Sequence, residues 1–348
     1  MEEVLFSTQD NGVAVITLNR PKAINSLNYE MLVPIREKLL EWEQDDRICL
    51  VILKGAGAKG FCAGGDIKTL YQAKDNKDGY DKAITFFTEE YLTDQLVTSF
   101  SKPILAILDG VVMGGGIGLS YGASHRIVTE RSKWAMPEMN IGFFPDVGAA
   151  YFLNKAPGYA GRYLALTANV ITATDVLYVN GADTAVSSNQ LEALEKQVME
   201  TNWHIEQDRA AKLDLLLDTC HPTSIPDGEI EALQSKIDQH FSYGTVEQII
   251  DSLKSDNSEF ASKTKETLLS KSPISLKVTL DQLIKGENKT LEECLETDLV
   301  LARNFLKSHD FYEGVRSVVI DKDRNPKYNY QQLSDVSPSV VNSFFNVN

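Results

Sequence analysis

Several features that would place a chain in a specialised class are missing from these 348 residues. No apolar run reaches the ~18 residues that a membrane-spanning helix needs, so no membrane association is expected. The four cysteines, Cys49, Cys62, Cys220 and Cys294, include no C-x-x-C pair, which argues against a zinc site and against a disulfide framework. The acidic start, residues 1–4, resembles neither a secretory signal nor an Arg-rich transit peptide. These absences predict a metal-free cytoplasmic protein, with a processed precursor as the alternative.

Basic residues are also scarce relative to acidic ones. The chain has 34 Lys and Arg against 49 Asp and Glu, a formal net charge of -15. Proteins that bind nucleic acids generally use clustered basic residues to neutralise phosphates, so no nucleic-acid partner is expected. Any polyanionic small molecule would need a local basic patch to offset this overall charge.

The apolar pattern of the first half predicts alternating strands and helices. Residues 4–7 and 13–18 read as a β-hairpin around the Asp-Asn-Gly turn at 10–12. Residues 29–43 carry apolar side chains at helical spacing, and residues 48–53 form a continuous apolar run typical of a buried strand. Because this alternation continues to about residue 185, we expect a layered α/β domain.

The second half is predicted to be almost wholly helical. Thr290 and Glu293 match a capping box, and apolar residues follow them at helical spacing. Residues 221–228 are rich in helix breakers and predict a loop. We therefore expect a core over residues 1–200 and a helical region over residues 201–348. Whether that region is a separate domain or a layer folded over the core stays open.

Two glycine-rich segments fail the common phosphate-binding motifs. Residues 55–60 have the glycine spacing of a P-loop, but Phe61 and Cys62 stand where Lys and Ser or Thr are required. Residues 114–118 follow a strand, yet no frame gives G-x-G-x-x-G. Glycines let backbone approach a ligand and leave N–H groups free, so the loops at 61–68 and 114–118 could each aim one N–H at a single oxygen. The alternative is that both loops merely close strands.

Three segments together resemble the core motifs of the enoyl-CoA hydratase/isomerase (crotonase) superfamily: residues 19–27, 61–68 and 113–119. Five further segments resemble the 3-hydroxyisobutyryl-CoA hydrolases within it: residues 89–91, 136–148, 272–277, 309–316 and 320–327. The resemblance covers nearly the whole chain. It implies a crotonase-like (ClpP/crotonase) layered ββα core with an α-helical C-terminal region.

The resemblance also implies roles for individual residues. The N–H groups of Gly65 and Gly115 would form an oxyanion hole for the carbonyl of an acyl-CoA substrate, and Glu90 would help hold the acyl end. Contacts to coenzyme A are implied for a larger group: Lys22, Ala23, Ile24, Ala63, Gly64, Asp66, Ile67 and Lys68. We assign Lys22 and Lys68 to the phosphates as a hypothesis.

One departure from the family pattern favours hydrolysis over hydration. Hydratases of the superfamily add water with two glutamates, and Gly118 stands at the position of the first. Glu138 matches the second, and Glu138 with Asp146 matches the Glu and Asp pair of the hydrolases. The implied reaction is hydrolysis of a 3-hydroxyisobutyryl-CoA thioester in valine breakdown, with no cofactor. The alternatives are an enoyl-CoA hydratase or isomerase that uses Glu138 alone, and a catalytically silent acyl-CoA-binding protein.

Each candidate carboxylate also has a structural interpretation. Asp146 could cap the helix that follows it, Glu138 could be an ion-paired loop residue, and Glu90 could lie on a solvated helix face. Relatives of this superfamily commonly form trimers or pairs of trimers, so a homo-oligomer is a further expectation, although the helical C-terminal region could change the assembly.

Overall fold

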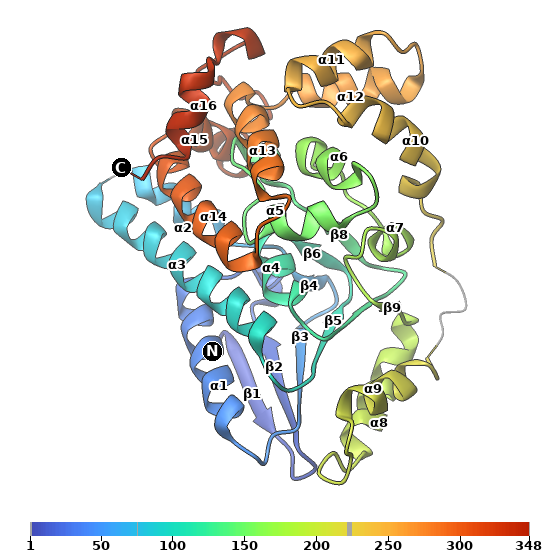
Figure 1. Cartoon of the computed structure of the whole chain (residues 1–348). Coiled ribbons are helices and arrows are strands. Elements are labelled where there is room, and N and C mark those ends of the chain that lie inside the picture. The colour runs from blue at the N-terminus through green and yellow to red at the C-terminus, as the bar shows by residue number, and fades with distance from the viewer. Residues whose placement is uncertain (1, 75, 221–224, 348) are drawn as a thin grey trace. The chain divides into compact units, whose positions relative to one another are not determined.

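The computed structural model describes residues 2–74, 76–220 and 225–347, which fall into two compact units (Figure 1). Unit 1 comprises Met1–Gly65, Glu89–Trp134 and Ile171–Gly228. Unit 2 comprises Asp66–Thr88, Ala135–Val170 and Glu229–Asn348. Neither unit is one continuous stretch, and the predicted division at residue 200 stays a prediction. Part of the predicted breaker loop, residues 221–224, lies outside the described residues.

Unit 1 contains two sheets. The larger has six strands in the order β1-β2-β3-β5-β7-β9, and every neighbouring pair is parallel except β1 with β2. Its strands are β1 Val4–Thr8, β2 Val13–Leu18, β3 Leu50–Gly55, β5 Ile104–Leu108, β7 His125–Val128 and β9 Thr184–Ala185. The smaller sheet contains β4 Gly60–Cys62, β6 Val111–Met113 and β8 Lys133–Ala135. The antiparallel pairing of β1 with β2 confirms the predicted hairpin.

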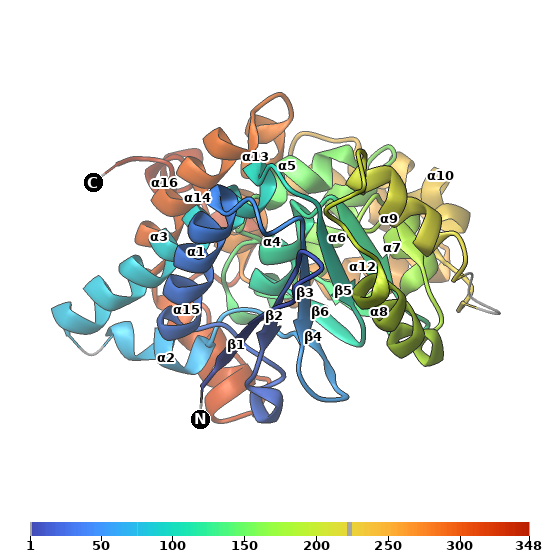
Figure 2. The ribbon, with the colours of Figure 1, turned by 90° about the horizontal axis from the view of Figure 1, so that it is seen from below.

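Helices lie on both sides of the large sheet of unit 1, with α8 and α9 on one side and α1 on the other (Figure 2). The helices of this unit are α1 Tyr29–Gln44, α4 Gly115–Tyr121, α7 Ala173–Tyr178, α8 Leu191–Glu200, α9 Arg209–Leu217 and the later part of α3 Lys77–Ser99. Ile52 and Ile107 of the sheet pack in one apolar core with Leu194 of α8 and Leu213 of α9. The predicted apolar face of α1 is buried, which confirms that helix. Apolar packing on both faces explains why the central strands are continuous hydrophobic runs.

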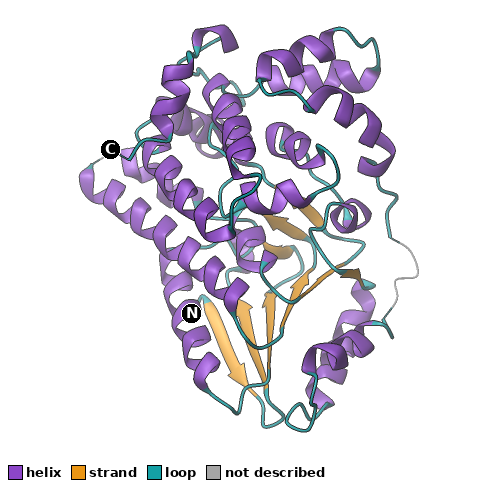
Figure 3. Cartoon of the chain, in the orientation of Figure 1, coloured by secondary structure: helices purple, strands orange, loops and turns teal. Residues whose placement is uncertain are grey.

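Regular structure in the described part of unit 2 is helical apart from Ala135 at the end of β8 (Figure 3). Its helices are α2 Ile67–Tyr71, the start of α3, α5 Ala149–Phe152, α6 Ala160–Thr167, α10 Ile230–Phe241, α11 Val246–Lys254, α12 Glu259–Leu269, α13 Pro273–Gly286, α14 Leu291–Phe305, α15 His309–Val315 and α16 Pro338–Phe344. The predicted capping box of Thr290 and Glu293 begins α14. Across the described ranges, no helix combines the length and apolar character that crossing a bilayer requires.

Candidate active site

Two glycine loops of unit 1 approach each other closely. Gly65 follows β4, and Gly115 begins α4. A Cβ atom placed on Gly115 would lie 3.4 Å from the backbone nitrogen of Gly65. Gly114, with φ at 49°, makes the turn into α4 in a conformation that favours glycine. The hydrogen bonds among the described residues leave the N–H groups of Gly65 and Gly115 unused. Two neighbouring backbone segments therefore each offer one donor.

Glu90 lies directly against Gly115 within unit 1. A Cβ atom on Gly115 would overlap Oε1 of Glu90, so no side chain fits at that position. Glu90 is 2% exposed, and its neighbour Glu89 is ion-paired with Arg36. The interpretation of Glu90 as part of a solvated helix face is therefore wrong. Its carboxyl group instead lies beside the start of α4.

Asn25 joins the loop before α1 to the loop that ends in Gly65. Its buried side-chain amide donates to the carbonyl oxygens of Gly60 (3.1 Å) and Phe61 (3.1 Å). The backbone N–H of Ala63 donates to the carbonyl of Ile24 over 2.9 Å. Asn25 has φ at 55°, a left-handed conformation that Asn tolerates better than most residues. No role was predicted for Asn25 from the sequence, where the available signal was an asparagine in a turn-like stretch four residues after Pro21.

The residues predicted to contact coenzyme A are divided between the two units. Ile24, Ala63 and Gly64 lie together in unit 1, where Gly64 also accepts a hydrogen bond from the backbone of Leu27 (2.8 Å). Lys22 and Ala23 lie exposed in the same loop. A second group belongs to unit 2 and comprises Asp66, Ile67 and Lys68 at the start of α2. The ammonium groups of Lys22 and Lys68 are thus on exposed residues, as a phosphate contact requires.

Glu138 begins a short 3₁₀-helix of unit 2, Glu138–Ile141. Gly142, with φ at 65°, ends this turn, and its N–H donates to the carbonyl of Glu138. The side chain is 8% exposed, and its Oε2 is buried without a hydrogen-bond partner among the described residues. Burial raises the pKa of Glu138 well above its usual value, and repulsion from Asp146 raises it further. Among the described residues no cation acts on Glu138, so the interpretation as an ion-paired loop residue is wrong.

The segment over residues 309–316 packs directly behind the Glu138 turn. A Cβ atom on Gly314 of α15 would overlap the carbonyl of Ile141, and one on Gly142 would overlap the carbonyl of Asp310. Backbone thus meets backbone on this side of the turn. The predicted motif at 309–316 has a structural role here: it supports the turn that carries the candidate base.

Asp146 lies 5% exposed in the turn before α5. α5 begins at Ala149, its N-cap residue is Gly148, and none of the described side chains caps it. The helix-capping interpretation of Asp146 is therefore wrong. Val147, with φ at 52°, has a left-handed backbone conformation that is rare for a β-branched residue. Strain of this kind persists only where the surrounding structure enforces it, and such positions cluster at functional sites.

The predicted site residues thus form two groups, each inside one unit. Gly65, Gly115 and Glu90 meet in unit 1. Glu138 and Asp146 interact in unit 2. The first group offers two hydrogen-bond donors beside a buried carboxyl group, and the second offers two coupled carboxyl groups. Among the described side chains, no group of three or more His, Cys, Asp and Glu could hold a metal ion.

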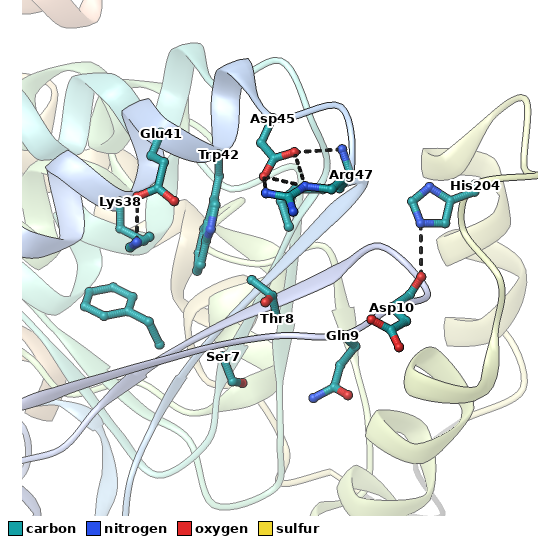
Figure 4. A pocket seen from close by; sticks show the side chains of 12 residues that line it. Ser7, Thr8, Gln9, Asp10, Lys38, Glu41, Trp42, Asp45, Arg47 and His204 are labelled. Carbon is teal, nitrogen blue, oxygen red and sulfur yellow. Dashed lines mark hydrogen bonds and ion pairs between the residues drawn. The ribbon is translucent and has the colours of Figure 1, made fainter.

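A surface pocket of unit 1, with a cavity volume of about 380 Å³, involves none of these residues (Figure 4). Its lysine and arginine side chains pair with acidic neighbours that also line the pocket. Lys38 bonds Glu41 (2.6 Å), and Arg47 bonds Asp45 (2.7 Å). Because these charges already have partners, the pocket offers no free cation for a polyanionic ligand such as coenzyme A.

Comparison with characterised proteins adds close relatives. The chain is 42% identical over 347 residues to the mitochondrial 3-hydroxyisobutyryl-CoA hydrolase of Mus musculus, covering 99% of this chain and 88% of the relative. It is 40% identical over 348 residues to the protein of the same name from Homo sapiens, again covering 99% and 88%. These relatives support the predicted resemblance to the hydrolases.

The names of these relatives correct one prediction. They are called mitochondrial, so the prediction of a cytoplasmic protein is wrong. All four cysteines are buried free thiols, which is compatible with any reducing compartment and does not distinguish one from another.

Solved structures confirm the crotonase fold. A carnitinyl-CoA dehydratase from Mycobacterium thermoresistibile has a TM-score of 0.91 and 34% identity, covering 100% of this chain and 97% of that one. An enoyl-CoA hydratase from Rhodobacter sphaeroides has a TM-score of 0.87 and 30% identity, covering 99% and 97%. The sequence profile of the enoyl-CoA hydratase/isomerase family matches residues 13–345, nearly the whole chain. This chain therefore belongs to the enoyl-CoA hydratase/isomerase family.

Proposed function

We propose that the protein hydrolyses the thioester of 3-hydroxyisobutyryl-CoA, or of a similar short 3-hydroxyacyl-CoA, to the free acid and coenzyme A. The observation that carries this proposal is the buried pair of Glu138 and Asp146, in a chain that has Gly118 where a hydratase has its first glutamate. The similarity to relatives named 3-hydroxyisobutyryl-CoA hydrolase supports the choice of substrate.

The N–H groups of Gly65 and Gly115 stabilise the oxygen of the thioester carbonyl in this proposal. Attack on the carbonyl carbon moves negative charge onto that oxygen, so donors fixed in advance bind the transition state more strongly than the substrate. Their unused N–H groups and close approach support this role. Removal of one such donor typically costs about 2.7–4 kcal/mol of transition-state stabilisation.

Glu138 acts at the carbonyl carbon. Its carboxylate either attacks that carbon, breaking the C–S bond to give an anhydride and the CoA thiolate, or removes a proton from a water that attacks and expels the same thiolate. In the first route water then opens the anhydride to the free acid and restores Glu138, and in both routes the thiolate takes up a proton to leave as free CoA. Glu138 has a buried carboxylate oxygen without a partner among the described residues, and its pKa is raised. Both features suit either role, because the group is poorly solvated and basic. Asp146 orients the 3-hydroxyl group or assists proton transfer, and Glu90 holds the acyl end.

Lys22 and Lys68 bind the phosphates of coenzyme A. Both are exposed cations on a chain with a net charge of -15, so they supply local positive charge where the overall field is unfavourable. The chemistry uses only backbone donors and carboxylates, so the proposal includes no cofactor. The proposed hydrolysis would be a step of valine breakdown. Homo-oligomer formation stays a prediction.

Hydration of an enoyl-CoA is the second candidate. The similar solved structures described above are a carnitinyl-CoA dehydratase and an enoyl-CoA hydratase, which favours this reaction. Against it stands Gly118, which lies within α4 and has no side chain to activate water. A hydratase would have to work with Glu138 alone.

Two assays in parallel test the proposal. Free-thiol release is measured with 3-hydroxyisobutyryl-CoA, and loss of the enoyl absorbance is measured with crotonyl-CoA. We expect rapid thiol release and no loss of absorbance. Loss of absorbance without thiol release would establish the hydratase instead, and binding of the esters without either reaction would indicate a silent acyl-CoA-binding protein.

A further inference from the structure

Two buried polar side chains hold the turn that carries Asp146. The N–H of Gly148 donates to Oδ2 of Asp298 over 2.8 Å, and the carbonyl of Pro145 accepts from Nε2 of Gln282 over 2.9 Å. The same Nε2 donates to Oδ1 of Asp298 over 2.8 Å. One hydrogen-bonded chain thus links both ends of the turn to α13 and α14. Both helices belong to unit 2, as does the turn.

The orientation of Gln282 follows from its neighbours. Its amide nitrogen faces two acceptors, so exchanging nitrogen and oxygen would place Oε1 against a carbonyl and a carboxylate. Its Oε1 is buried without a hydrogen-bond partner among the described residues. A buried acceptor without a partner is costly. Gln282 therefore stabilises the folded chain through the N–H donors of its amide group, which bind the carbonyl of Pro145 and the carboxylate of Asp298.

Asp298 is fully buried and lies on the apolar face of α14 with Leu295 and Ala302. Burial raises its pKa well above the usual value, and repulsion from Asp146 raises it further, while the N–H of Gly148 lowers it. An acidic residue on a buried helix face opposes folding unless its contacts compensate. In the described residues those contacts are the turn at Gly148 and the amide of Gln282.

We propose that Asp298 and Gln282 are positioning residues, which lock the turn over residues 145–148 and thereby fix the carboxyl group of Asp146 for the reaction. The proposal rests on the proposed function and deepens it. The left-handed backbone of Val147 is the strain that this lock maintains. Without the lock the turn relaxes, and Asp146 leaves the geometry that the transition state requires. Neither Asp298 nor Gln282 is assigned a contact with the substrate.

Two variants test the lock. Asp298→Asn keeps the shape and an acceptor for Gly148, but it turns an amide group toward the amide of Gln282. Gln282→Met removes both donors at nearly constant length. Thr245→Ala is the control, because it removes only the N-cap of α11, where Thr245 accepts from the backbone of Gln248 over 3.3 Å. The full-length variants are compared for melting temperature, kcat, KM and backbone hydrogen exchange of a peptide spanning residues 145–152.

Asp298→Asn and Gln282→Met should each lower kcat for thiol release by about tenfold to a hundredfold and leave KM within about twofold, because a small misplacement of a reacting group acts mainly on the transition state. Exchange of the 145–152 peptide should accelerate in both. Thr245→Ala should lower the melting temperature and change neither kcat nor that exchange. If Asp298→Asn does not fold, Gln282→Met decides.

Unchanged kcat in the folded variants, with a melting temperature lowered as in the control, would overturn the proposal and leave Asp298 and Gln282 a purely structural role. Failure of the proposed function has a different signature, namely absence of thiol release by the unmodified protein. In that case hydrogen exchange of the 145–152 peptide alone tests whether Asp298 and Gln282 hold the turn. Unchanged exchange in both variants would overturn the proposal.

Discussion

The carboxyl groups of Glu138 and Asp146 are both buried, and repulsion between them adds to burial in raising the pKa of Glu138. Two carboxyl groups that share a poorly solvated site resist ionising together. Glu138 therefore keeps its proton to a higher pH than an exposed carboxyl group does, so its protonated and ionised forms are both accessible near that raised pKa. Hydrolysis of a thioester uses both forms, because one group must take up a proton or attack, and another must orient or donate.

The pH dependence of kcat should report this repulsion. Glu138 acts when ionised, so kcat should fall as the pH drops through its raised pKa. Asp146→Asn removes the second charge, which lowers the pKa of Glu138 and moves the acid limb of the residual activity to lower pH. A pH profile of thiol release for both proteins measures the shift. An acid limb at the same pH in both would show that Asp146 does not act on the titrating group.

The contribution of Glu138 to folding stability should fall as the pH rises, whereas kcat should rise with pH over the same range. Its pKa is raised in the folded chain above the ordinary value of 4.5, so its contribution to stability is fully present below that pH and is lost as the pH rises through the folded pKa. Glu138→Gln does not titrate. We compare the difference in melting temperature, variant minus unmodified protein, at about pH 4 and about pH 8. This difference should be larger at the higher pH, because only the unmodified protein loses stability as Glu138 ionises. A difference that does not change with pH would contradict the raised pKa.

Gly115 should tolerate no side chain. Gly115→Ala places a methyl group on Oε1 of Glu90, so either the carboxyl group or the start of α4 must move. The displaced N–H donor should lower kcat by about a hundredfold or more. Gly244→Ala is the matched control, since nothing lies within 4 Å of an added Cβ there. Near-normal kcat for Gly115→Ala would show that the N–H of Gly115 is not a donor of the oxyanion hole.

Charge reversal at Lys22 or Lys68 should weaken substrate binding and leave the chemical step intact. Lys22→Glu and Lys68→Glu are each expected to raise KM for the CoA ester several-fold, more at low salt than at high salt, with kcat nearly unchanged. Lys196→Glu, on the exposed face of α8, serves as the control. If KM stays at the unmodified value in both variants, these lysines do not bind the phosphates.

The sequence predicted those parts of the site that lie in local patterns. The hairpin, α1 and the capping box of α14 follow from periodicity and turn chemistry, which act within a few residues. Gly65, Gly115 and Glu138 lie in short motifs that the resemblance identified. The interpretation of Asp146 as a helix cap could not be excluded from local sequence, because Asp146 and Gly148 both precede α5 and both residue types occur at N-caps.

Contacts between distant segments could not be predicted in this way. Gln282 lies 137 residues from Pro145 along the chain, and Asp298 lies 150 residues from Gly148. One signal was present in the sequence. Asp298 stands four residues before Ala302, on the apolar stripe of a predicted helix, and an acidic residue at such a position indicates a specific partner. The identity of that partner depends on the packing of α14, which no local pattern specifies.

Whether Glu138 acts at the carbonyl carbon is measured by thiol release from 3-hydroxyisobutyryl-CoA. The rate of Glu138→Ala is compared with that of the unmodified protein at matched folded concentration. Circular dichroism and the melting temperature establish that the variant is folded. We expect rapid release by the unmodified protein and a loss of at least about a hundredfold in kcat for the variant, in the range of general acid–base catalysis. Comparable turnover by the folded variant would show that another group acts at the carbonyl carbon.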